Sequence, residues 1–148
     1  MEAFTFSYPT KNYFGQGAAR KALAEELPKY GKRVLLAYGG GSVTRNGSYA
    51  EVLAILKDQG KEVTEFAGIM SNPTYRKVQE GARLVREHRI DLILAVGGGS
   101  VSDCCKAVSA QAALEEALYD YEYAKHKVPT AGVPMGVIVT ASGTGSEQ

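Results

Sequence analysis

The chain has 148 residues, enough for one domain with a sizeable core, and its 17 basic and 16 acidic residues leave a net charge near zero. That balance excludes the basic surface of a nucleic-acid-binding protein, and no apolar run reaches membrane-spanning length. Because the N-terminus lacks a signal peptide and the only cysteines are the adjacent Cys104 and Cys105, we expect a cytoplasmic protein whose thiols are small helix-filling side chains.

Hydrophobic periodicity predicts that strands and helices alternate along the chain. Proline and glycine mark several boundaries, among them Pro28, Gly31 and Gly60. In chain order the predicted elements are a strand over 4–8, a short strand over 12–14, a helix over 18–27, a strand over 33–38, a helix over about 47–59, a strand over 62–66, a helix over 75–89, a strand over 92–96, a helix from 100 and a strand over 133–139. Strands separated by helices imply βαβ units. The expected fold is α/β, a doubly wound, mostly parallel Rossmann-like sheet with a short N-terminal β extension.

A glycine turn follows the predicted strand at residues 92–96. This strand is an unbroken apolar run, which is typical of a strand covered on both faces. The glycines at 97–99 let the backbone turn sharply and approach a ligand closely, and Ser100 is a suitable N-cap for the helix that follows. A helix N-terminus attracts anions, so this turn suits a phosphate.

The same arrangement occurs upstream, where residues 36–44 match residues 94–102 at all but two positions. The strand predicted over 133–139 also ends in a small polar run, residues 140–146. One explanation is that tight strand-to-helix turns converge on glycine and serine. Near identity favours a shared role at one sheet edge, because ligands of open α/β sheets bind outside the carboxyl ends of the strands. Three such turns predict a polyphosphate or dinucleotide site.

The chain stops at Gln148, immediately after the third of these turns. The first two turns lead into predicted helices, and a domain seldom ends on a functional loop with nothing to hold it. We therefore interpret the chain as part of a longer protein whose second half is missing.

The run Gly97-Gly98-Gly99-Ser100-x-x-Asp103-x-x-Lys106 resembles the fingerprint of the iron-containing (group III) alcohol dehydrogenases. Asn72-Pro73, Thr140 and residues 143–147 occur in the expected order around it. The segments 4–17 and 38–47 are most similar to the branch of butanol dehydrogenases and NADPH-dependent aldehyde reductases. The resemblance covers all of residues 1–148, but only the family's N-terminal dinucleotide-binding domain. It implies that an all-helical second domain, which in the family binds a catalytic iron or zinc through an aspartate and histidines, would begin after Gln148.

The resemblance also implies how the matching residues would bind the cofactor. The turn at residues 97–100 would hold the pyrophosphate, and Thr140 with Thr144 would hydrogen-bond it or the neighbouring ribose. Asp103 would lie near the nicotinamide ribose, Asn72 near the adenine and the turn at residues 39–42 near the adenosine ribose. The cofactor-binding residues expected on this basis are Gly39, Gly40, Gly41, Ser42, Asn72, Gly97, Gly98, Gly99, Ser100, Asp103, Thr140, Ser142 and Thr144.

The resemblance favours NADP(H) over NAD(H). NAD-preferring members tend to carry an aspartate at the position of Gly39, and its absence removes the repulsion against a 2′-phosphate. Ser42 and the backbone of Gly40 and Gly41 would then bind that phosphate, while Arg45 either adds charge or is merely solvated.

Simpler explanations stand beside several of these assignments. Ser100 and Asp103 have the spacing of a capping box, and Lys106 has the spacing of a surface pair with Asp103. Asn72 is also an ordinary turn residue before proline, and Thr140 is also the residue that ends a strand.

The chain offers no recognisable metal site of its own, because its two histidines, His88 and His126, are far apart and no acids cluster with them. Residues 1–148 alone are therefore expected neither to hold a catalytic metal nor to reduce aldehydes.

The function predicted for the parent protein is hydride transfer between NADP(H) and a small alcohol or aldehyde, with this chain as its cofactor domain. A homodimer is expected through the strand at residues 4–8, whose apolar face would meet its equivalent. Two alternatives stay open. One is a glycerol dehydrogenase or dehydroquinate synthase relative, which shares the Gly-Gly-Gly-Ser-x-x-Asp turn, and the other is a non-catalytic nucleotide-binding module.

Overall fold

The computed structural model describes residues 3, 5, 7, 9–141, 143 and 145–147. From residue 18 onward, the long helices and the strands follow the order expected from hydrophobic periodicity, with three short helices between them. They are α1 (Ala18–Glu26), η1 (Leu27–Lys29), β1 (Arg33–Tyr38), α2 (Gly41–Arg45), α3 (Ser48–Asp58), β2 (Glu62–Phe66), α4 (Tyr75–Glu87), β3 (Leu92–Gly97), α5 (Gly99–Ala113), η2 (Asp120–Ala124) and β4 (Met135–Val139).

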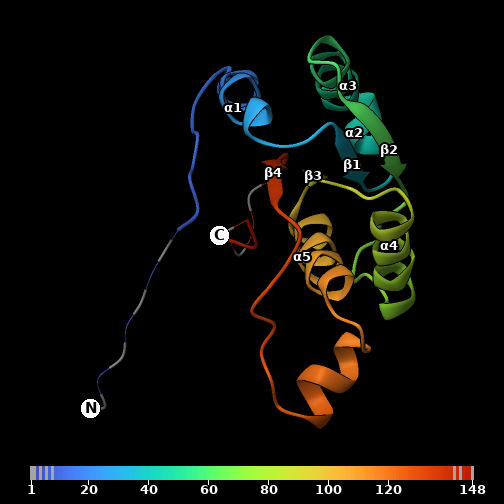
Figure 1. Ribbon diagram of the computed structural model, residues 1–148. Helices are drawn as coiled ribbons and strands as arrows, with labels where there is room; N and C mark the ends of the chain where they lie inside the picture. The colour runs from blue at the N-terminus through green and yellow to red at the C-terminus, as the bar shows by residue number, and fades with distance from the viewer. Residues whose placement is uncertain are drawn as a thin grey trace.

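The four strands form one parallel sheet in the order β2-β1-β3-β4. Every residue of β3 is buried, as its unbroken apolar run predicts, while β4 at the edge of the sheet is only half-buried. Parallel strands with helical connections confirm the predicted α/β, Rossmann-like fold (Figure 1).

Alternate residues of each strand point into two different cores. Leu35 and Ile93 pack with α4 and α5, whereas Leu36 and Leu94 pack with α1 and α3. Helices therefore cover both faces of the sheet, with α1 to α3 on one side and α4 with α5 on the other (Figure 1). Complete burial of one such leucine or isoleucine side chain contributes about 1.5–3 kcal/mol.

The packing of α4 on α5 requires a glycine at the crossing. A Cβ on Gly81 would lie 2.6 Å from Val108 Cγ2 and 2.8 Å from Phe66 Cε1. The buried Cys104 and Cys105 belong to the same core, as expected for small filling side chains. Burial raises the pKa of the Cys104 thiol to about 11 and that of Cys105 further, so neither is a ready nucleophile.

The second short strand predicted at residues 12–14 is wrong. These residues form no strand, and the Phe14 side chain is fully exposed. Extended backbone becomes a strand only where a neighbour pairs its N–H and C=O groups, and none of the described strands lies beside this segment. Of the strand predicted at residues 4–8, Phe4, Phe6 and Tyr8 lie outside the described residues.

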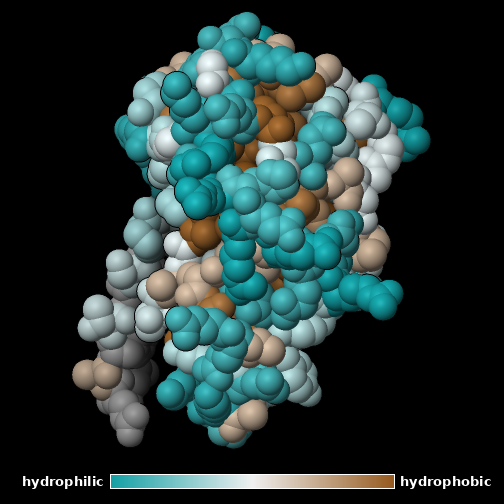
Figure 2. All heavy atoms as spheres, turned by 45° about the vertical axis from the view of Figure 1, so that its right-hand side comes forward, coloured by the Kyte–Doolittle hydropathy of each residue, from teal (hydrophilic) through white to brown (hydrophobic). Residues whose placement is uncertain are grey.

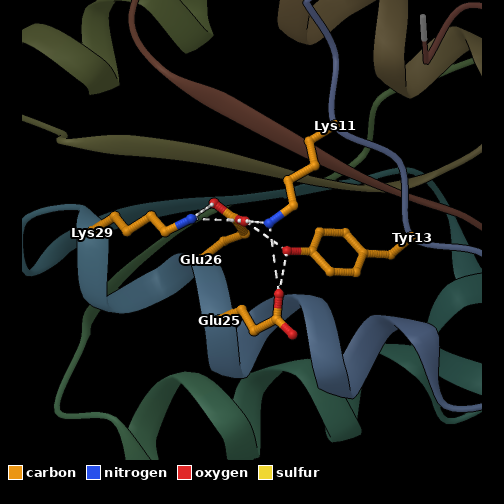
Figure 3. Close-up of polar contacts among 5 residues, drawn as sticks. All are labelled: Lys11, Tyr13, Glu25, Glu26 and Lys29. Atoms are coloured by element: carbon orange, nitrogen blue, oxygen red, sulfur yellow. Dashed lines mark hydrogen bonds and ion pairs between the residues drawn. The ribbon is translucent and has the colours of Figure 1, made fainter.

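Polar contacts with α1 hold residues 11–13 instead (Figure 3). Lys11 Nζ lies 2.8 Å from Glu26 Oε1, and the Tyr13 hydroxyl oxygen lies 2.6 Å from the same atom and 2.7 Å from Glu25 Oε2. The single hydroxyl hydrogen serves one carboxylate at a time. Lys29 closes the cluster on the other side of Glu26 at 3.0 Å.

This cluster should make the attachment of residues 11–13 sensitive to acid. Hydrogen bonds from Lys11, Tyr13 and Lys29 lower the pKa of Glu26 from 4.5 to about 2. A lowered pKa means that the stabilisation is complete above about pH 4.5 and is lost as the pH falls towards 2. The backbone ¹⁵N order parameters of residues 11–13 should fall across that range, and Glu26→Gln should lower them already at pH 7. Glu62→Gln, at an exposed acid of β2, is the control; equal effects of both variants would contradict this account.

Gln111 organises the segment between α5 and η2. Its side chain is 2% exposed, and its Oε1 accepts hydrogen bonds from the Tyr75 hydroxyl at 3.1 Å, Gln79 Nε2 at 3.0 Å and the Leu118 backbone N–H at 2.7 Å. Its Nε2 donates to the Glu116 carbonyl at 2.9 Å. One buried amide thus fixes the fold of residues 114–118.

The face in Figure 2 carries mainly hydrophilic side chains, and hydrophobic ones show between them in separate patches. None of the helices in the described part of the chain is long and apolar enough to cross a membrane.

Candidate functional site

The turns that follow β1, β3 and β4 open at one edge of the sheet. The strands are parallel neighbours, and the register pairs Tyr38 with Val96 and Gly97 with Val139, so all three end at nearly the same level. The Thr140 N–H donates to the Gly97 carbonyl at 3.0 Å, which carries this contact into the turns themselves. The structure therefore brings together the predicted residues at 39–42, 97–100 and 140.

The chain reverses its direction across the sheet between β1 and β3. From β1 it adds β2 on one side, and it then returns to add β3 and β4 on the other. At such a switch point the connections leave in opposite directions and open a crevice at the carboxyl ends of the strands. The first two glycine turns flank this crevice.

Close packing explains the glycines after β3. A Cβ on Gly97, whose φ is +157°, would lie 2.7 Å from Val101 Cγ2. A Cβ on Gly99 would lie 3.2 Å from Ser146 Oγ, where the turn after β4 passes the start of α5. A side chain at position 97 would press against α5, and one at position 99 would press against the turn after β4. Their absence lets a ligand approach the backbone.

The prediction that Ser100 is the N-cap of this helix is wrong. The N-cap is Gly98, whose extended backbone has φ −92° and ψ −164°, and α5 begins at Gly99. Ser100 lies within the first turn, so the capping box with Asp103 does not form, and Asp103 is exposed on α5. Gly98 supplies no capping side chain, and no other described residue caps α5. Among the described residues, the first N–H groups of this 15-residue helix are therefore without a side-chain cap at the turn, an arrangement that favours an anion.

Ser102, which the sequence did not predict as a site residue, stabilises this turn through a hydrogen bond to its backbone. It is 1% exposed, and its hydroxyl donates to the Gly98 carbonyl at 3.3 Å. A serine one turn into a helix gives no signal of its own, because the same pattern occurs on any helix.

The turn after β1 is covered by the loop that follows β2. The Gly68 and Ile69 N–H groups donate to the carbonyls of Gly39 and Tyr38 at 3.3 and 3.2 Å. A Cβ on Gly39 would lie 3.1 Å from the Ile69 carbonyl oxygen. Glycine at this position therefore has a packing reason as well as the predicted role beside a ribose.

The short helix α2, which the sequence did not predict, begins at Gly41 and contains Ser42. The Thr44 hydroxyl donates to the Gly41 carbonyl at 2.9 Å, and the Asn46 N–H donates to the Ser42 carbonyl at 3.0 Å. The glycine turn is thus closed by a turn and a half of helix before α3 starts.

The last predicted site residues are Asn72, in the loop after β2, and those of the turn after β4. Asn72 lies in the exposed loop after β2 with φ +52°, the conformation of a turn residue. Among the described residues, no hydrogen bond joins its side chain to the glycine turns. Thr140 is exposed at the site, and Ser142 and Thr144 lie outside the described residues.

Metal-binding side chains are not gathered here. Within residues 9–141 and the other described positions, no group of three or more histidine, cysteine, aspartate or glutamate side chains lies close enough to hold a metal ion. Both His88 and His126 are exposed.

A broad open hollow of about 1070 Å³ borders the site between α1 and β4. Its walls include the face of β4 that no helix covers, with Gly136 and Ile138, and its rim reaches Thr140 and Ala141. The site thus continues from a polar, glycine-rich edge into a wider apolar depression.

Comparison with known proteins gives one consistent result. Residues 9–148 match the family described as iron-containing alcohol dehydrogenase. The chain is 46% identical to the probable NADH-dependent butanol dehydrogenase 2 of Bacillus subtilis, and the match covers 99% of this chain and 37% of that protein. It is 40% identical to the NADPH-dependent aldehyde reductase YqhD of Escherichia coli, with 99% of this chain and 38% of that protein covered.

Among solved structures, NADH-dependent butanol dehydrogenase A of Thermotoga maritima superposes with a TM-score of 0.89 at 38% identity. The superposition covers 98% of this chain and 36% of that one. The chain thus spans less than two-fifths of the length of these relatives.

Proposed function

The chain belongs to the iron-containing alcohol dehydrogenase family, and from this premise we propose that residues 1–148 are the dinucleotide-binding domain of an NADP(H)-dependent alcohol dehydrogenase or aldehyde reductase. The observation that carries the proposal is the meeting of three small-residue turns at the carboxyl edge of β1, β3 and β4. A dinucleotide needs such an edge, because its pyrophosphate must approach backbone N–H groups closely.

The residues present fit a dinucleotide. The first turn of α5 would hold the pyrophosphate through its N–H groups, with Gly97, Gly98 and Gly99 leaving room for it. Thr140 stands at the neighbouring strand end with its hydroxyl available for the same phosphates or a ribose. Asp103 would lie toward the nicotinamide ribose and Asn72 toward the adenine. When bound, the nicotinamide would supply or accept the hydride, and the protein would position it.

Preference for NADP(H) over NAD(H) is the finer part of the proposal. Gly39 carries no carboxylate to repel a 2′-phosphate, and Ser42 with Gly40 and Gly41 would receive that phosphate. Relatives named for NADH and for NADPH both match the chain, at 46% and 40% identity, so the choice rests on the turn itself.

Substrate chemistry is assigned to the parent protein. We propose a small alcohol or aldehyde as its substrate, in line with the names of the relatives. The described residues do not supply a cluster for a metal, so a catalytic iron or zinc would be held by a helical domain outside this chain.

We further propose a cytoplasmic homodimer that pairs through residues 4–8.

Calorimetric titration of the chain with NADPH and NADH tests the proposal. We expect NADPH to bind about tenfold more tightly, because that ratio requires only about 1.4 kcal/mol, less than a hydrogen bond to a charged group provides. Equal or tighter NADH binding would overturn the NADP(H) preference but leave the dinucleotide site. Failure of the folded chain to bind either cofactor would overturn the proposed function itself.

A further inference from the structure

Two peptide planes in the turn after β3 are fixed by hydrogen bonds to their carbonyls. The Gly97 carbonyl accepts from the Thr140 N–H at 3.0 Å. The Gly98 carbonyl accepts from the Ser102 N–H at 3.2 Å, one turn into α5. No cis peptide bond occurs in the described part of the chain, and in a trans peptide the N–H points away from the carbonyl that precedes it. The N–H groups of Gly98 and Gly99 are therefore turned away from Thr140 and from the body of α5.

Among the described residues, neither of these two N–H groups has an acceptor. No hydrogen bond within that part of the chain has the N–H of Gly98 or Gly99 as its donor. Because α5 begins at Gly99, the Gly99 N–H leaves the helix at its positive end and points into the space between the turns. The pyrophosphate of the proposed dinucleotide would approach from that side.

The Ser102 side chain adds a second donor to the Gly98 carbonyl. Its hydroxyl donates to that oxygen at 3.3 Å, and the residue is buried. Its neighbours on α5 (Val101, Cys104 and Cys105) belong to the apolar core. A hydroxyl is costly to bury unless it is hydrogen-bonded, and within the described residues the Ser102 hydroxyl makes this bond alone. What the hydroxyl adds to an otherwise apolar position is therefore its bond to the turn.

We propose that Ser102 is a positioning residue for the dinucleotide, which it does not itself contact. This inference rests on the proposed cofactor site. With two donors on its oxygen, the Gly98 carbonyl holds its peptide plane in one orientation, and the Gly99 N–H on the same plane is held with it. A carbonyl that accepts a second hydrogen bond is also more polarised, which makes the N–H of that peptide a stronger donor. Ser102 thus orients the N–H before the pyrophosphate arrives, so less ordering is needed on binding.

Calorimetric titration of the whole chain with NADPH, together with urea unfolding, tests this role. Ser102→Ala should weaken NADPH binding about three- to tenfold, the range that the loss of one neutral hydrogen bond gives. Ser102→Cys keeps a weak donor on a small side chain and should bind with intermediate affinity.

Ser109→Ala is the matched control on the same helix. Ser109 is also buried, and its hydroxyl donates to the Val133 carbonyl at 2.7 Å, away from the glycine turn. Because this bond is shorter than that of Ser102, Ser109→Ala should lower the urea midpoint at least as much as Ser102→Ala does. It should nevertheless keep the wild-type affinity for NADPH.

The amide proton of Gly99 provides a signature that a merely structural serine would not change. In ¹⁵N-labelled wild-type chain and in Ser109→Ala, its resonance should move downfield when NADPH saturates the site, because a hydrogen bond to an ionised acceptor is short and strong. In Ser102→Ala that downfield shift should be smaller.

Two results would overturn the role of Ser102 and leave the proposed dinucleotide site intact. One is wild-type affinity in Ser102→Ala with an unchanged Gly99 shift, and the other is an equal loss of affinity in Ser102→Ala and Ser109→Ala. If Ser102→Ala does not fold, Ser102→Cys decides, and wild-type affinity and Gly99 shift in that variant would overturn the role. Absence of NADPH binding by a wild-type chain with a folded circular dichroism spectrum would overturn this inference and the proposed function together.

Discussion

Replacing Gly97 with alanine is expected to weaken NADPH binding by about 10- to 100-fold. The new Cβ would lie 2.7 Å from Val101 Cγ2 and 3.1 Å from Val101 Cβ, so the start of α5 must move away from β3. That movement displaces the N–H groups proposed to hold the pyrophosphate, and the loss of one hydrogen bond to a charged group costs about 1.5–3 kcal/mol. Strain in the turn should also lower the free energy of unfolding by about 1–3 kcal/mol.

Gly40→Ala is the matched control for folding at the equivalent turn. Gly40 has an ordinary extended backbone, with φ −82°, and no heavy atom lies within 4 Å of the place its Cβ would take. This variant should unfold at nearly the wild-type denaturant concentration. Calorimetric titration and urea unfolding measure both effects, and wild-type affinity in Gly97→Ala would contradict the close packing on which the site depends.

Replacing Gln111 with leucine is expected to cost about 2–4 kcal/mol in the free energy of unfolding. The change keeps the side-chain volume but removes the acceptor of the buried Leu118 N–H, which donates to Gln111 Oε1 at 2.7 Å. It also removes the acceptor of Tyr75 and Gln79 and the donor to the Glu116 carbonyl. A buried donor left without a partner costs about 1–3 kcal/mol by itself, and the other groups add to that.

Urea unfolding of the chain measures this loss, with Gln79→Ala as the control. Gln79 contributes one of the three donors and is only half-buried, so its removal should cost about 1 kcal/mol or less. Amide exchange should also locate the damage of Gln111→Leu at residues 114–124. Equal stabilities of the two variants would show that Gln111 is not the centre of this network.

Most of the sheet could be predicted from the sequence, because its signals are local and strong. The unbroken apolar run of β3 predicts that both of its faces are covered, and every residue of β3 is buried in the structure. The near identity of residues 36–44 and 94–102 predicted two equivalent turns, and parallel strands necessarily place such turns at one edge.

The errors occurred where the outcome depends on neighbours distant in sequence. Residues 12–14 have the composition of a strand, but none of the described strands pairs with them, and Tyr13 contacts the acids of α1 instead. Ser100 has the chemistry of an N-cap, but Gly98 takes that place because its extended backbone lets the helix begin two residues earlier than a cap at position 100 would allow. Ile69 carries no sequence signal at all, since its contribution is a backbone carbonyl beside Gly39.

The central claim is that one dinucleotide lies across the three turns at the carboxyl edge of β1, β3 and β4. Titration of ¹⁵N-labelled chain with NADPH, followed by amide chemical shifts, tests it most directly. We expect the largest shifts at Gly39 to Ser42, Gly97 to Ser100 and Thr140, with the amides of α4 nearly unchanged. Shifts confined to α1 and to the residues of β4 that line the hollow, with the amides of the glycine turns unchanged, would contradict the claim.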